Sequence, residues 1–422
     1  MTAGLGMLDD QQVAALFGTP TYVYDLDAVA AAVDELSGWL PEPVTLFYSV
    51  KANPHPDVLA VLCERGCAAE VSSTGEVEAV VAAGFEPSCC LYTGPAKTFD
   101  ELATAIDGGV RRFSAESTTE LHRLSRVARS TGRDLECVLR LNSALTNGAT
   151  GLRMTGTASQ FGIDLGSSPP NGDDLRVPGV DVVGVHFFAQ TNCASGTELA
   201  AEFRAHIRVA RQLSDRWAIP WTLLDLGGGF AAPYACPGRR PEYPLLADAI
   251  TEALDEAFPR WATTMTVAFE SGRYLVGCAG RLVCSVVDVK TSAGTTFVVL
   301  DTGVNHIGGM AGIGRILAAR VTPDGAAWGD PAGSAVKLVG PLCTPADILN
   351  GALRGDRPRV GDLVGIPNAG AYGLTASLTA FLSRPAPAEV AVRGRSVVSH
   401  SRIGIHRTPL DRMRSNGAED RS

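Results

Sequence analysis

No apolar run in the sequence is long enough to cross a lipid bilayer, and residues 1–12 lack the basic and apolar regions of a secretory signal. Positive charge is also scarce, because 36 lysines and arginines stand against 45 aspartates and glutamates, which gives a net charge of -9. Such an acidic balance argues against a general nucleic-acid-binding surface. We therefore expect a cytoplasmic protein that binds neither membranes nor nucleic acids.

The ten cysteines lack the spacing of a metal site. Cys63 and Cys67, like Cys89 and Cys90, have no second cysteine pair or histidine pair to complete a ligand set. Cys137 and others lie inside apolar runs, which is typical of core thiols in a reducing compartment. We expect neither a structural metal nor a disulfide framework.

Apolar runs typical of strands alternate with helix-like segments up to residue 275. About eight such repeats over roughly 250 residues favour a (β/α)8 barrel, with its parallel sheet, that spans residues 20–275. Active sites of such barrels lie at the carboxyl ends of the strands. The expected strands are 22–24, 46–50, 69–72, 90–92, 112–114, 137–141, 182–186, 222–226 and 266–269.

Beyond residue 275 the pattern changes to β-rich runs with glycine and proline breaks and few helices. This predicts a second, all-β domain over residues 276–405. The polar tail, residues 406–422, is expected to be disordered. The expected strands of the second domain are 281–290, 295–300, 336–342, 363–366 and 389–392.

Lys51 ends the apolar run 46–50 and is followed by the turn signal Asn53-Pro54. Burial at a strand end would disfavour the charged form of this lysine and lower its pKa. A lysine of that kind suits Schiff-base chemistry with an aldehyde. The alternative is a lysine that extends its ammonium group from the strand end into water.

Other polar groups end neighbouring strands: Arg140, His186 and Glu270, together with the glycine turn 227–229. Consecutive glycines after a strand let backbone N–H groups converge on an anion such as phosphate. Pyridoxal phosphate requires a lysine, a phosphate site and a partner for its ring nitrogen. Glu270 can pair with that nitrogen, and His186 can cover the ring. The alternative is a set of unrelated polar residues at strand ends.

The chain resembles the fold-type III pyridoxal-phosphate decarboxylases, the group that contains diaminopimelate and ornithine decarboxylases. The resemblance extends over residues 19–405, with every motif in the family order. The matching motifs are Tyr48-Ser49-Val50-Lys51-Ala52-Asn53, Glu70-Val71-Ser72-Ser73, Leu139-Arg140-Leu141-Asn142, Gln160-Phe161-Gly162-Ile163-Asp164, Asp225-Leu226-Gly227-Gly228-Gly229-Phe230, Glu270-Ser271-Gly272-Arg273, Gly340-Pro341-Leu342-Cys343-Thr344-Pro345-Ala346-Asp347 and Gly370-Ala371-Tyr372.

This resemblance implies a barrel and a β-domain, with residues 1–19 packed on the β-domain. It also implies a head-to-tail homodimer whose active sites are completed across the interface. Lys51 would bond the cofactor covalently, His186 would stack on its ring and Glu270 would pair with the ring nitrogen. Cys343 of the partner subunit would return a proton to the substrate after carbon dioxide leaves. The alternative for this cysteine is a core thiol.

The resemblance assigns further residues to the cofactor and substrate. The cofactor set also contains Glu70, Arg140, Gly227, Gly228, Gly229, Gly272, Arg273 and Tyr372, with the Tyr372 hydroxyl on the phosphate. The substrate set is Arg273, Cys343, Asp347 and Tyr372.

Three departures from the family pattern concern the substrate. The segment 301–310 lacks the Arg-Pro-x-Leu-Tyr motif of diaminopimelate decarboxylases, and with it a clamp for a distal carboxylate. Thr344 replaces an acidic residue after the cysteine, and the family's His-x-Gly-Ser becomes His186-Phe187-Phe188-Ala189. In these respects the chain looks like the subgroup that decarboxylates amino acids held as carrier-protein thioesters. We expect α-decarboxylation of a carrier-bound, acidic L-amino acid.

Two other functions remain open on sequence grounds. One is decarboxylation of a free diamino acid, namely diaminopimelate, lysine, ornithine or arginine. The other is amino-acid racemisation, for which racemases resembling this fold place an arginine, not a glutamate, at the ring nitrogen. An acidic carrier protein would need a basic docking patch, although arginines at helical spacing can also form an ordinary solvated face. The candidate faces are Arg123, Arg126, Arg129 and Arg133, and Arg204, Arg208, Arg211 and Arg216.

Overall fold

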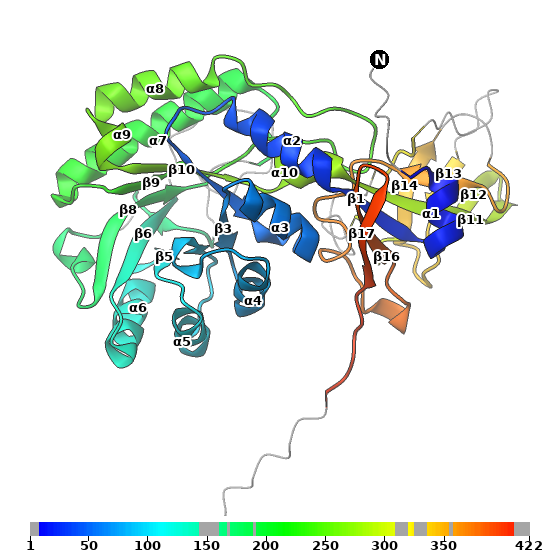
Figure 1. Ribbon diagram of the computed structural model, residues 1–422, viewed down its shortest axis with the longest axis horizontal. Coiled ribbons are helices and arrows are strands. Elements are labelled where there is room, and N and C mark those ends of the chain that lie inside the picture. The colour runs from blue at the N-terminus through cyan, green and yellow to red at the C-terminus, as the bar shows by residue number, and fades with distance from the viewer. Residues whose placement is uncertain are drawn as a thin grey trace, which may run out of the picture.

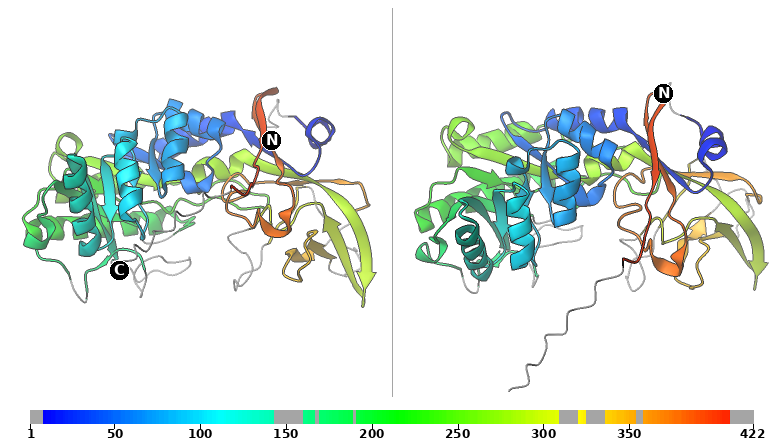
Figure 2. Two further views of the ribbon diagram at one scale, coloured as in Figure 1. Left: turned by 90° about the horizontal axis from the view of Figure 1, so that it is seen from below. Right: turned by 60° about the horizontal axis from the view of Figure 1, so that its bottom comes forward.

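The computed structural model describes residues 8–142, 160–166, 169–188, 191–308, 320–324, 336–353 and 358–408. Two bodies lie side by side along the long axis of the molecule, a helix-covered barrel and a mixed β-sheet (Figure 1). The two further views show the same division (Figure 2). Within the described residues, no helix is both long and apolar enough to cross a membrane. Most of the expected disordered tail lies outside the described residues.

The first body is a closed barrel of eight parallel strands, as expected from the sequence. Pairing between β5 and β6 closes the sheet, and the two-residue strand β7 (Ile163–Asp164), which the sequence does not signal, pairs with β6 outside the ring. The barrel strands are β2 (Thr45–Ser49), β3 (Ala68–Val71), β4 (Leu91–Tyr92), β5 (Arg112–Ala115), β6 (Leu135–Asn142), β8 (Val180–Phe187), β9 (Leu223–Asp225) and β10 (Thr266–Ser271).

Helices cover the outside of the barrel (Figure 1) because each carries a buried apolar stripe. In α2 (Leu26–Ser37) the stripe includes Val29, Val33 and Leu36, and the Asp25 carboxylate caps the first turn. The other helices of this body are α3 (Pro56–Glu64), α4 (Thr74–Ala82), α5 (Phe99–Asp107), α6 (Thr118–Thr131), α7 (Gly196–Trp217), α8 (Leu246–Ala257), α9 (Trp261–Thr264) and α10 (Arg273–Val276).

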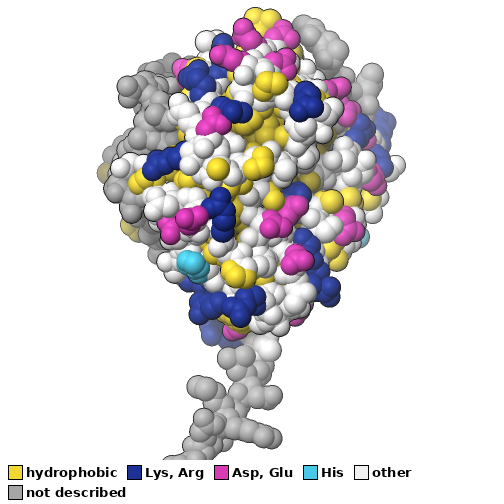
Figure 3. Space-filling model, turned by 90° about the vertical axis from the view of Figure 1, so that its left-hand side faces the viewer, with side chains coloured by type: hydrophobic (Ala, Val, Ile, Leu, Met, Phe, Trp, Pro, Cys, Tyr) yellow, Lys and Arg dark blue, Asp and Glu magenta, His cyan; other side chains and the backbone are white. Residues whose placement is uncertain are grey.

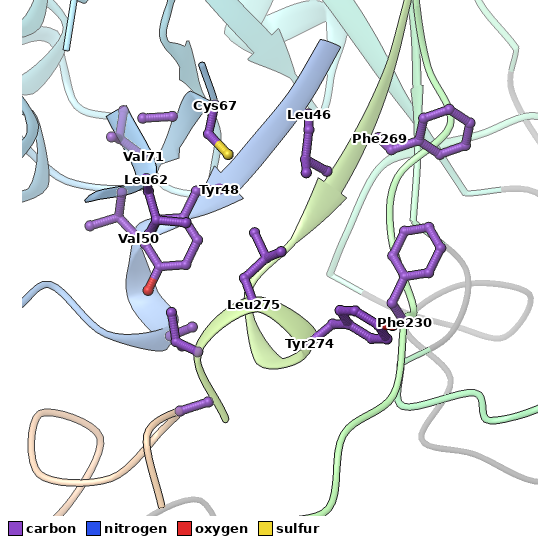
Figure 4. Close-up of a cluster of buried hydrophobic side chains, with 14 of the residues drawn as sticks. Leu46, Tyr48, Val50, Leu62, Cys67, Val71, Phe230, Phe269, Tyr274 and Leu275 are labelled. Carbon is purple, nitrogen blue, oxygen red and sulfur yellow. The ribbon is translucent and has the colours of Figure 1, made fainter. Parts of the chain in front are cut away.

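The outer faces of the strands pack against these helices in the main hydrophobic core. Figure 4 shows part of it, where Tyr48 of β2 lies beside Leu62 of α3, and Phe269 of β10 lies near Phe230. Because successive strand residues point to opposite faces, these outward side chains fix which residues point inward.

Inside the barrel, an apolar layer is followed by a polar layer. The apolar layer consists of Phe47, Leu91, Val138, Leu223 and Ala268. The next inward position on each strand lies two residues later, toward the carboxyl end. These positions hold Ser49, Thr93, Arg140, Asp225 and Glu270, all buried. Strand periodicity therefore gathers polar groups at the end of the barrel where catalytic groups are expected.

The second body is a mixed sheet with the order β14-β13-β12-β11-β1-β16-β17, and β15 pairs with β11. Strands β14 and β17 are not signalled in the sequence. Its strands are β1 (Thr21–Asp25), β11 (Gly280–Ser292), β12 (Thr295–Leu300), β13 (Val336–Val339), β14 (Ile348–Leu353), β15 (Leu363–Ile366), β16 (Ala388–Arg393) and β17 (Ser396–Arg402).

The assignment of residues 22–24 to the barrel, expected from the sequence, is wrong. Strand β1 belongs to the second sheet, where it pairs antiparallel with β11 and parallel with β16. Its local pattern, a strand followed by a helix, is the same as that of a barrel unit. Only the long-range partners distinguish the two sheets. Helix α1 (Asp10–Phe17) lies against β11 and β15, with Val13 buried beside Val23 and Val283 and an ion pair of 3.0 Å between Asp10 and Arg281.

Candidate active site

Lys51 lies in a short 3-10 turn, Val50–Ala52, that directly follows β2. Its Nζ is 2.5 Å from Oε2 of Glu70 on the adjacent strand β3, and its side chain is 42% exposed. Burial lowers the pKa of Lys51, but the Glu70 and Glu270 carboxylates outweigh it and raise this pKa above the usual value. The lowered pKa expected from sequence is therefore wrong for this arrangement, because the expectation ignored the carboxylates that the neighbouring strands supply.

Glu70 is a buried, fully occupied acceptor. Its Oε1 accepts a hydrogen bond from the Thr93 hydroxyl, and the Ser72 hydroxyl lies 3.0 Å from that of Thr93. Burial raises the pKa of Glu70, but the Lys51 ammonium and the hydrogen bonds from Lys51, Thr93 and Ser49 lower it to about 2. Glu70 is thus ionised at neutral pH and holds the lysine in place.

Three buried groups meet at the ends of the adjacent strands β8, β9 and β10. His186 Nε2 lies 3.2 Å from Glu270 Oε1, and one ligand atom from each of His186, Asp225 and Glu270 lies within 4.8 Å of the others. On the other side of the imidazole, Nδ1 is 2.8 Å from the Ser114 hydroxyl. The histidine ring is therefore fixed from both sides.

Burial and neighbouring carboxylates change the pKa values of Asp225 and His186. Burial and the neighbouring Glu270 raise the pKa of Asp225 to about 7. Burial lowers the pKa of His186, but Glu270 and Asp225 outweigh it and raise the pKa above its usual value. Two carboxylates and an imidazole can also ligate a divalent metal, but here they adjoin a lysine and a glycine turn, which suit an organic phosphate cofactor better.

The glycine turn follows β9. Gly227 and Gly229 have φ of 76° and 108°, values that other residues seldom adopt. A Cβ atom on Gly227 would lie 2.0 Å from the Phe187 carbonyl oxygen, and one on Gly228 would lie 2.3 Å from that of Glu270. The N–H groups of Gly228 and Gly229 donate to no acceptor among the described residues, so they are available to an anion.

A second wall of the site comes from residues after β10 and from a loop of the second body. The guanidinium carbon of Arg273 lies 4.9 Å from the centre of the Tyr372 ring. The Tyr372 N–H donates to the Ala52 carbonyl oxygen at 2.8 Å, which ties this loop to the Lys51 turn. A Cβ atom on Gly272 would lie only 2.8 Å from Cβ of Ala52. The structure thus brings Gly272, Arg273 and Tyr372 to the lysine.

Arg140 and Asp347, two residues expected to bind ligands, are engaged within the protein. Arg140 forms a buried ion pair of 2.9 Å with Glu116, and its guanidinium lies 5.0 Å from the centre of the Phe161 ring. Asp347 is 3% exposed, and its carboxylate accepts the N–H groups of Val304 and Leu342, each at 2.8 Å. Asp347 thereby shapes the turn that carries Cys343.

Cys343 is exposed on the second body, between β13 and β14. Among the described residues of one chain, no hydrogen bond or ion pair joins it to the group around Lys51. The structure therefore brings together Lys51, Glu70, His186, Glu270, the glycine turn, Arg273 and Tyr372, and no hydrogen bond or ion pair among the described residues links Cys343 to them.

Sequence reasoning assigned no role to Thr93, Ser114 or Asp225, although each contacts a group expected in the site. A signal was present, because Thr93 and Asp225 stand two residues after the inward-facing apolar residues Leu91 and Leu223. Without the strand pairing, however, the inward face of each strand was not known.

Buried polar atoms without sufficient hydrogen-bond partners indicate that these residues can hold pyridoxal phosphate. Within the described residues, Oδ2 of Asp225 and Oγ of Ser271 are buried without a hydrogen bond, and Nε2 of His186 and Oε1 of Glu270 have only each other, at 3.2 Å. Such atoms are costly unless a ligand satisfies them. The amine of Lys51 and the N–H groups of the glycine turn supply the other contacts that this cofactor requires.

Comparisons with known proteins agree with this geometry. The family described as "Pyridoxal-dependent decarboxylase, pyridoxal binding domain" matches residues 26–277. An L-glutamyl-[BtrI acyl-carrier protein] decarboxylase from Niallia circulans is 29% identical over 92% of this chain and 93% of its own length. A diaminopimelate decarboxylase from Zymomonas mobilis is 31% identical over 91% of this chain and 90% of its own length.

Among solved structures, diaminopimelate decarboxylase from Helicobacter pylori complexed with L-lysine superimposes with a TM-score of 0.75. It is 22% identical, and the match covers 92% of this chain and 95% of that one, so it supports the fold. The family match spans all eight barrel strands and includes the barrel residues that surround Lys51. The chain therefore belongs to the pyridoxal-dependent decarboxylases, enzymes that remove a carboxyl group from amino acids with pyridoxal phosphate as cofactor.

Proposed function

We propose that this enzyme removes the α-carboxyl group of an acidic L-amino acid that is bound to a carrier protein as a thioester. The observation that carries this substrate assignment is the lack of a cation in the segment 301–308. Within this described segment the ionisable side chains are Asp301 and His306, and burial lowers the pKa of His306 to about 4. A neutral histidine cannot replace the arginine clamp that a distal carboxylate would need.

The reaction itself limits the point of attachment. Decarboxylation at Cα requires a free α-amino group and a free α-carboxylate, so the thioester must use a side-chain carboxyl group. Among the common amino acids, glutamate and aspartate have one. The full-length similarity to an L-glutamyl carrier-protein decarboxylase supports glutamate as the first candidate.

The roles that we propose for the barrel residues follow from their positions. Lys51 bonds the cofactor and is oriented by Glu70. His186, fixed by Ser114, covers the ring, and Glu270 holds a proton on the ring nitrogen by charge pairing. The bound pyridoxal phosphate supplies a protonated ring that accepts the electron pair left by the departing carboxylate. The glycine turn, Gly272, Arg273 and the Tyr372 hydroxyl line its phosphate side and the substrate side.

We propose a homodimer in which Cys343 of the partner subunit donates a proton to the substrate carbon. Two features support this. Cys343 is exposed on the second body, and the buried carboxylate of Asp347 holds the preceding Leu342 N–H in a fixed turn. An exposed thiol in a fixed turn suits a site completed by a second copy.

Of the two arginine faces, that of α6 is the better docking surface for an acidic carrier protein. On α7, Arg204 pairs with Glu252 and Arg211 pairs with Asp215, so that face is largely neutralised. On α6, Arg126 and Arg129 are exposed without an ion pair among the described residues. Lys and Arg side chains gather along the lower part of the molecule's left-hand face (Figure 3), and α6 lies at the lower left of Figure 1.

A second candidate is decarboxylation of a free diamino acid, which the 31% identity to a diaminopimelate decarboxylase favours. Racemisation is less well supported, because Glu270 beside His186 provides a carboxylate where the racemases of this fold place an arginine.

Carbon dioxide release by the cofactor-loaded enzyme tests the proposal. Glutamyl and aspartyl carrier-protein thioesters should be compared with free L-glutamate, L-lysine, L-ornithine, L-arginine and meso-diaminopimelate. We expect turnover of a thioester and at least about a hundredfold lower kcat/KM for every free amino acid. Faster turnover of a free diamino acid would overturn the substrate assignment and leave the decarboxylase chemistry in place.

A further inference from the structure

Tyr234 lies in the connection between β9 and α8 that begins with the glycine turn. Its side chain packs partly buried against the main core, and none of the roles proposed above uses it. The Tyr234 hydroxyl accepts a hydrogen bond from the Gly308 N–H at 2.8 Å and donates one to the Tyr372 carbonyl oxygen at 3.0 Å. One hydroxyl thus joins three segments that are far apart in the sequence, and one of its partners is the residue proposed to contact the cofactor phosphate.

The backbone of Tyr372 has an unusual conformation. Its φ is 52°, in the left-handed region that residues other than glycine seldom adopt. Such a conformation persists only where the surrounding structure fixes it, and it is most frequent at ligand sites. Both polar groups of the Tyr372 backbone are bound, because its N–H donates to the Ala52 carbonyl oxygen at 2.8 Å and its carbonyl oxygen accepts the Tyr234 hydroxyl. These two hydrogen bonds fix where the Tyr372 side chain leaves the backbone.

The hydroxyl of Tyr234 has a defined direction. The Gly308 N–H can only donate, so the Tyr234 oxygen accepts on that side and its own proton is directed to the Tyr372 carbonyl oxygen. Burial raises the pKa of Tyr234 to about 12, although the Gly308 N–H and the Arg273 guanidinium act to lower it. The hydroxyl therefore keeps its proton at neutral pH and remains a donor to Tyr372.

We propose that Tyr234 is a positioning residue for the cofactor site. Its hydroxyl holds the Tyr372 backbone in the left-handed conformation that presents the Tyr372 hydroxyl to the phosphate of the cofactor. The inference rests on the proposed phosphate contact of Tyr372, and it does not depend on which amino acid the enzyme decarboxylates.

Other hydrogen bonds hold the same two segments together without the Tyr234 hydroxyl. The Ala235 N–H donates to the Asn368 carbonyl oxygen at 3.1 Å, and the Asn368 side-chain amide donates to the Cys236 carbonyl oxygen at 2.7 Å. Loss of the Tyr234 hydroxyl should therefore leave the fold intact and release only the constraint on Tyr372.

Affinity for pyridoxal phosphate tests the proposal without reference to turnover. Full-length holoenzyme and its variants are dialysed to equilibrium against decreasing concentrations of the cofactor, and the bound fraction is read from the cofactor's absorbance. Tyr234→Phe keeps the ring and removes only the hydroxyl. We expect it to weaken cofactor binding about tenfold, and Tyr372→Phe to weaken it at least as much, because each variant loses the Tyr372 contact with the phosphate.

A double-mutant cycle distinguishes positioning from a general effect on stability. If Tyr234 acts through the Tyr372 hydroxyl, the double variant should bind the cofactor no more than about threefold more weakly than Tyr372→Phe alone, whereas independent effects would multiply to about a hundredfold. The matched control is Tyr274→Phe, which removes a buried tyrosine hydroxyl that donates at 2.9 Å to Glu35 of α2, on the outside of the barrel. This control should leave the affinity unchanged.

The outcomes separate this inference from the role of Tyr372 itself. Wild-type affinity in Tyr234→Phe, an equal loss in Tyr274→Phe, or a multiplicative loss in the double variant would overturn the positioning role and leave the phosphate contact of Tyr372 in place. Wild-type affinity in Tyr372→Phe would overturn the phosphate contact and, with it, the positioning role of Tyr234.

Discussion

His186 Nε2 lies 3.2 Å from Glu270 Oε1, although the two residues belong to strands that are not neighbours. Strand β9 lies between β8 and β10 and contributes Asp225, which is in register with His186. Three consecutive strands thus place one ionisable side chain each at the same level of the barrel interior. Since all three are buried, two carboxylates lie together in a low-dielectric interior, and a cation placed among them would be strongly favoured.

Replacement of Lys51 by alanine should lower turnover by more than about a thousandfold, because the lysine amine both bonds the cofactor and is the group that Glu70 orients. Carbon dioxide release measures the rate, and borohydride reduction followed by peptide mass analysis should locate the cofactor on residue 51 of the wild type. Thr93→Val is a useful control, since it keeps the lysine and removes only one hydrogen bond of Glu70. Turnover by Lys51→Ala near the wild-type rate would refute the assignment.

Glu270→Gln should reduce kcat by about a hundredfold or more while the cofactor still binds. The amide preserves the shape of the side chain but removes the negative charge beside His186. The cofactor's absorbance reports binding separately from the rate. A kcat within threefold of wild type would show that the proposed charge pairing at the ring nitrogen is unnecessary.

The stability of the cofactor-free protein should fall as the pH rises toward and through 7. The folded-state pKa of Asp225, about 7, is above its unfolded value, so its protonated form stabilises the fold at low pH and this contribution is lost as the pH rises through 7. The raised pKa of His186 acts in the same direction. Asp225→Asn should remove most of the Asp225 contribution, which is on the order of a few kcal/mol.

Denaturant unfolding of wild type and Asp225→Asn at pH 5 and pH 8.5 measures this difference. An equal change between the two pH values in both proteins would contradict the role of Asp225.

Mixing two inactive variants tests the shared active site. Dimers of Lys51→Ala and of Cys343→Ala each lack one group in both sites. After exchange of subunits at equal concentration, half of the dimers are mixed, and each has one intact site if Cys343 acts across the interface. Activity should then return to about a quarter of the wild-type value. Recovery below a few per cent, with mixed dimers demonstrated by mass, would place Cys343 in its own chain's site, whereas an active Cys343→Ala dimer would place it outside catalysis.

Charge reversal on α6 tests carrier-protein docking. Arg126→Glu combined with Arg129→Glu should raise KM for the thioester about tenfold and weaken its dependence on salt, with kcat little changed. The matched control is Arg204→Glu combined with Arg211→Glu on α7, whose arginines already have acidic partners. An equal effect of both pairs would argue against a specific role for α6.

Much of the architecture was accessible from the sequence. Apolar runs located all eight strands of the barrel, because a buried parallel strand is apolar on both faces. The same reading found β12 and β15 with the observed bounds. It missed β17, because this strand has no buried face that would give an apolar pattern, and its two valines, Val397 and Val398, are both exposed.

The motifs that surround Lys51, His186 and Glu270 identified the chemistry because each residue lies next to a recognisable strand end. The sequence alone could not decide three features that depend on distant neighbours. Strand β1 belongs to the second sheet because it pairs with β11 and β16. The pKa of Lys51 is raised because Glu70 lies on the adjacent strand. The Asp347 carboxylate accepts backbone N–H groups of a turn instead of facing a ligand. Hydrophobic periodicity is a local property that a sequence records directly, whereas strand pairing and electrostatic coupling join residues that only the folded chain brings within a few ångströms.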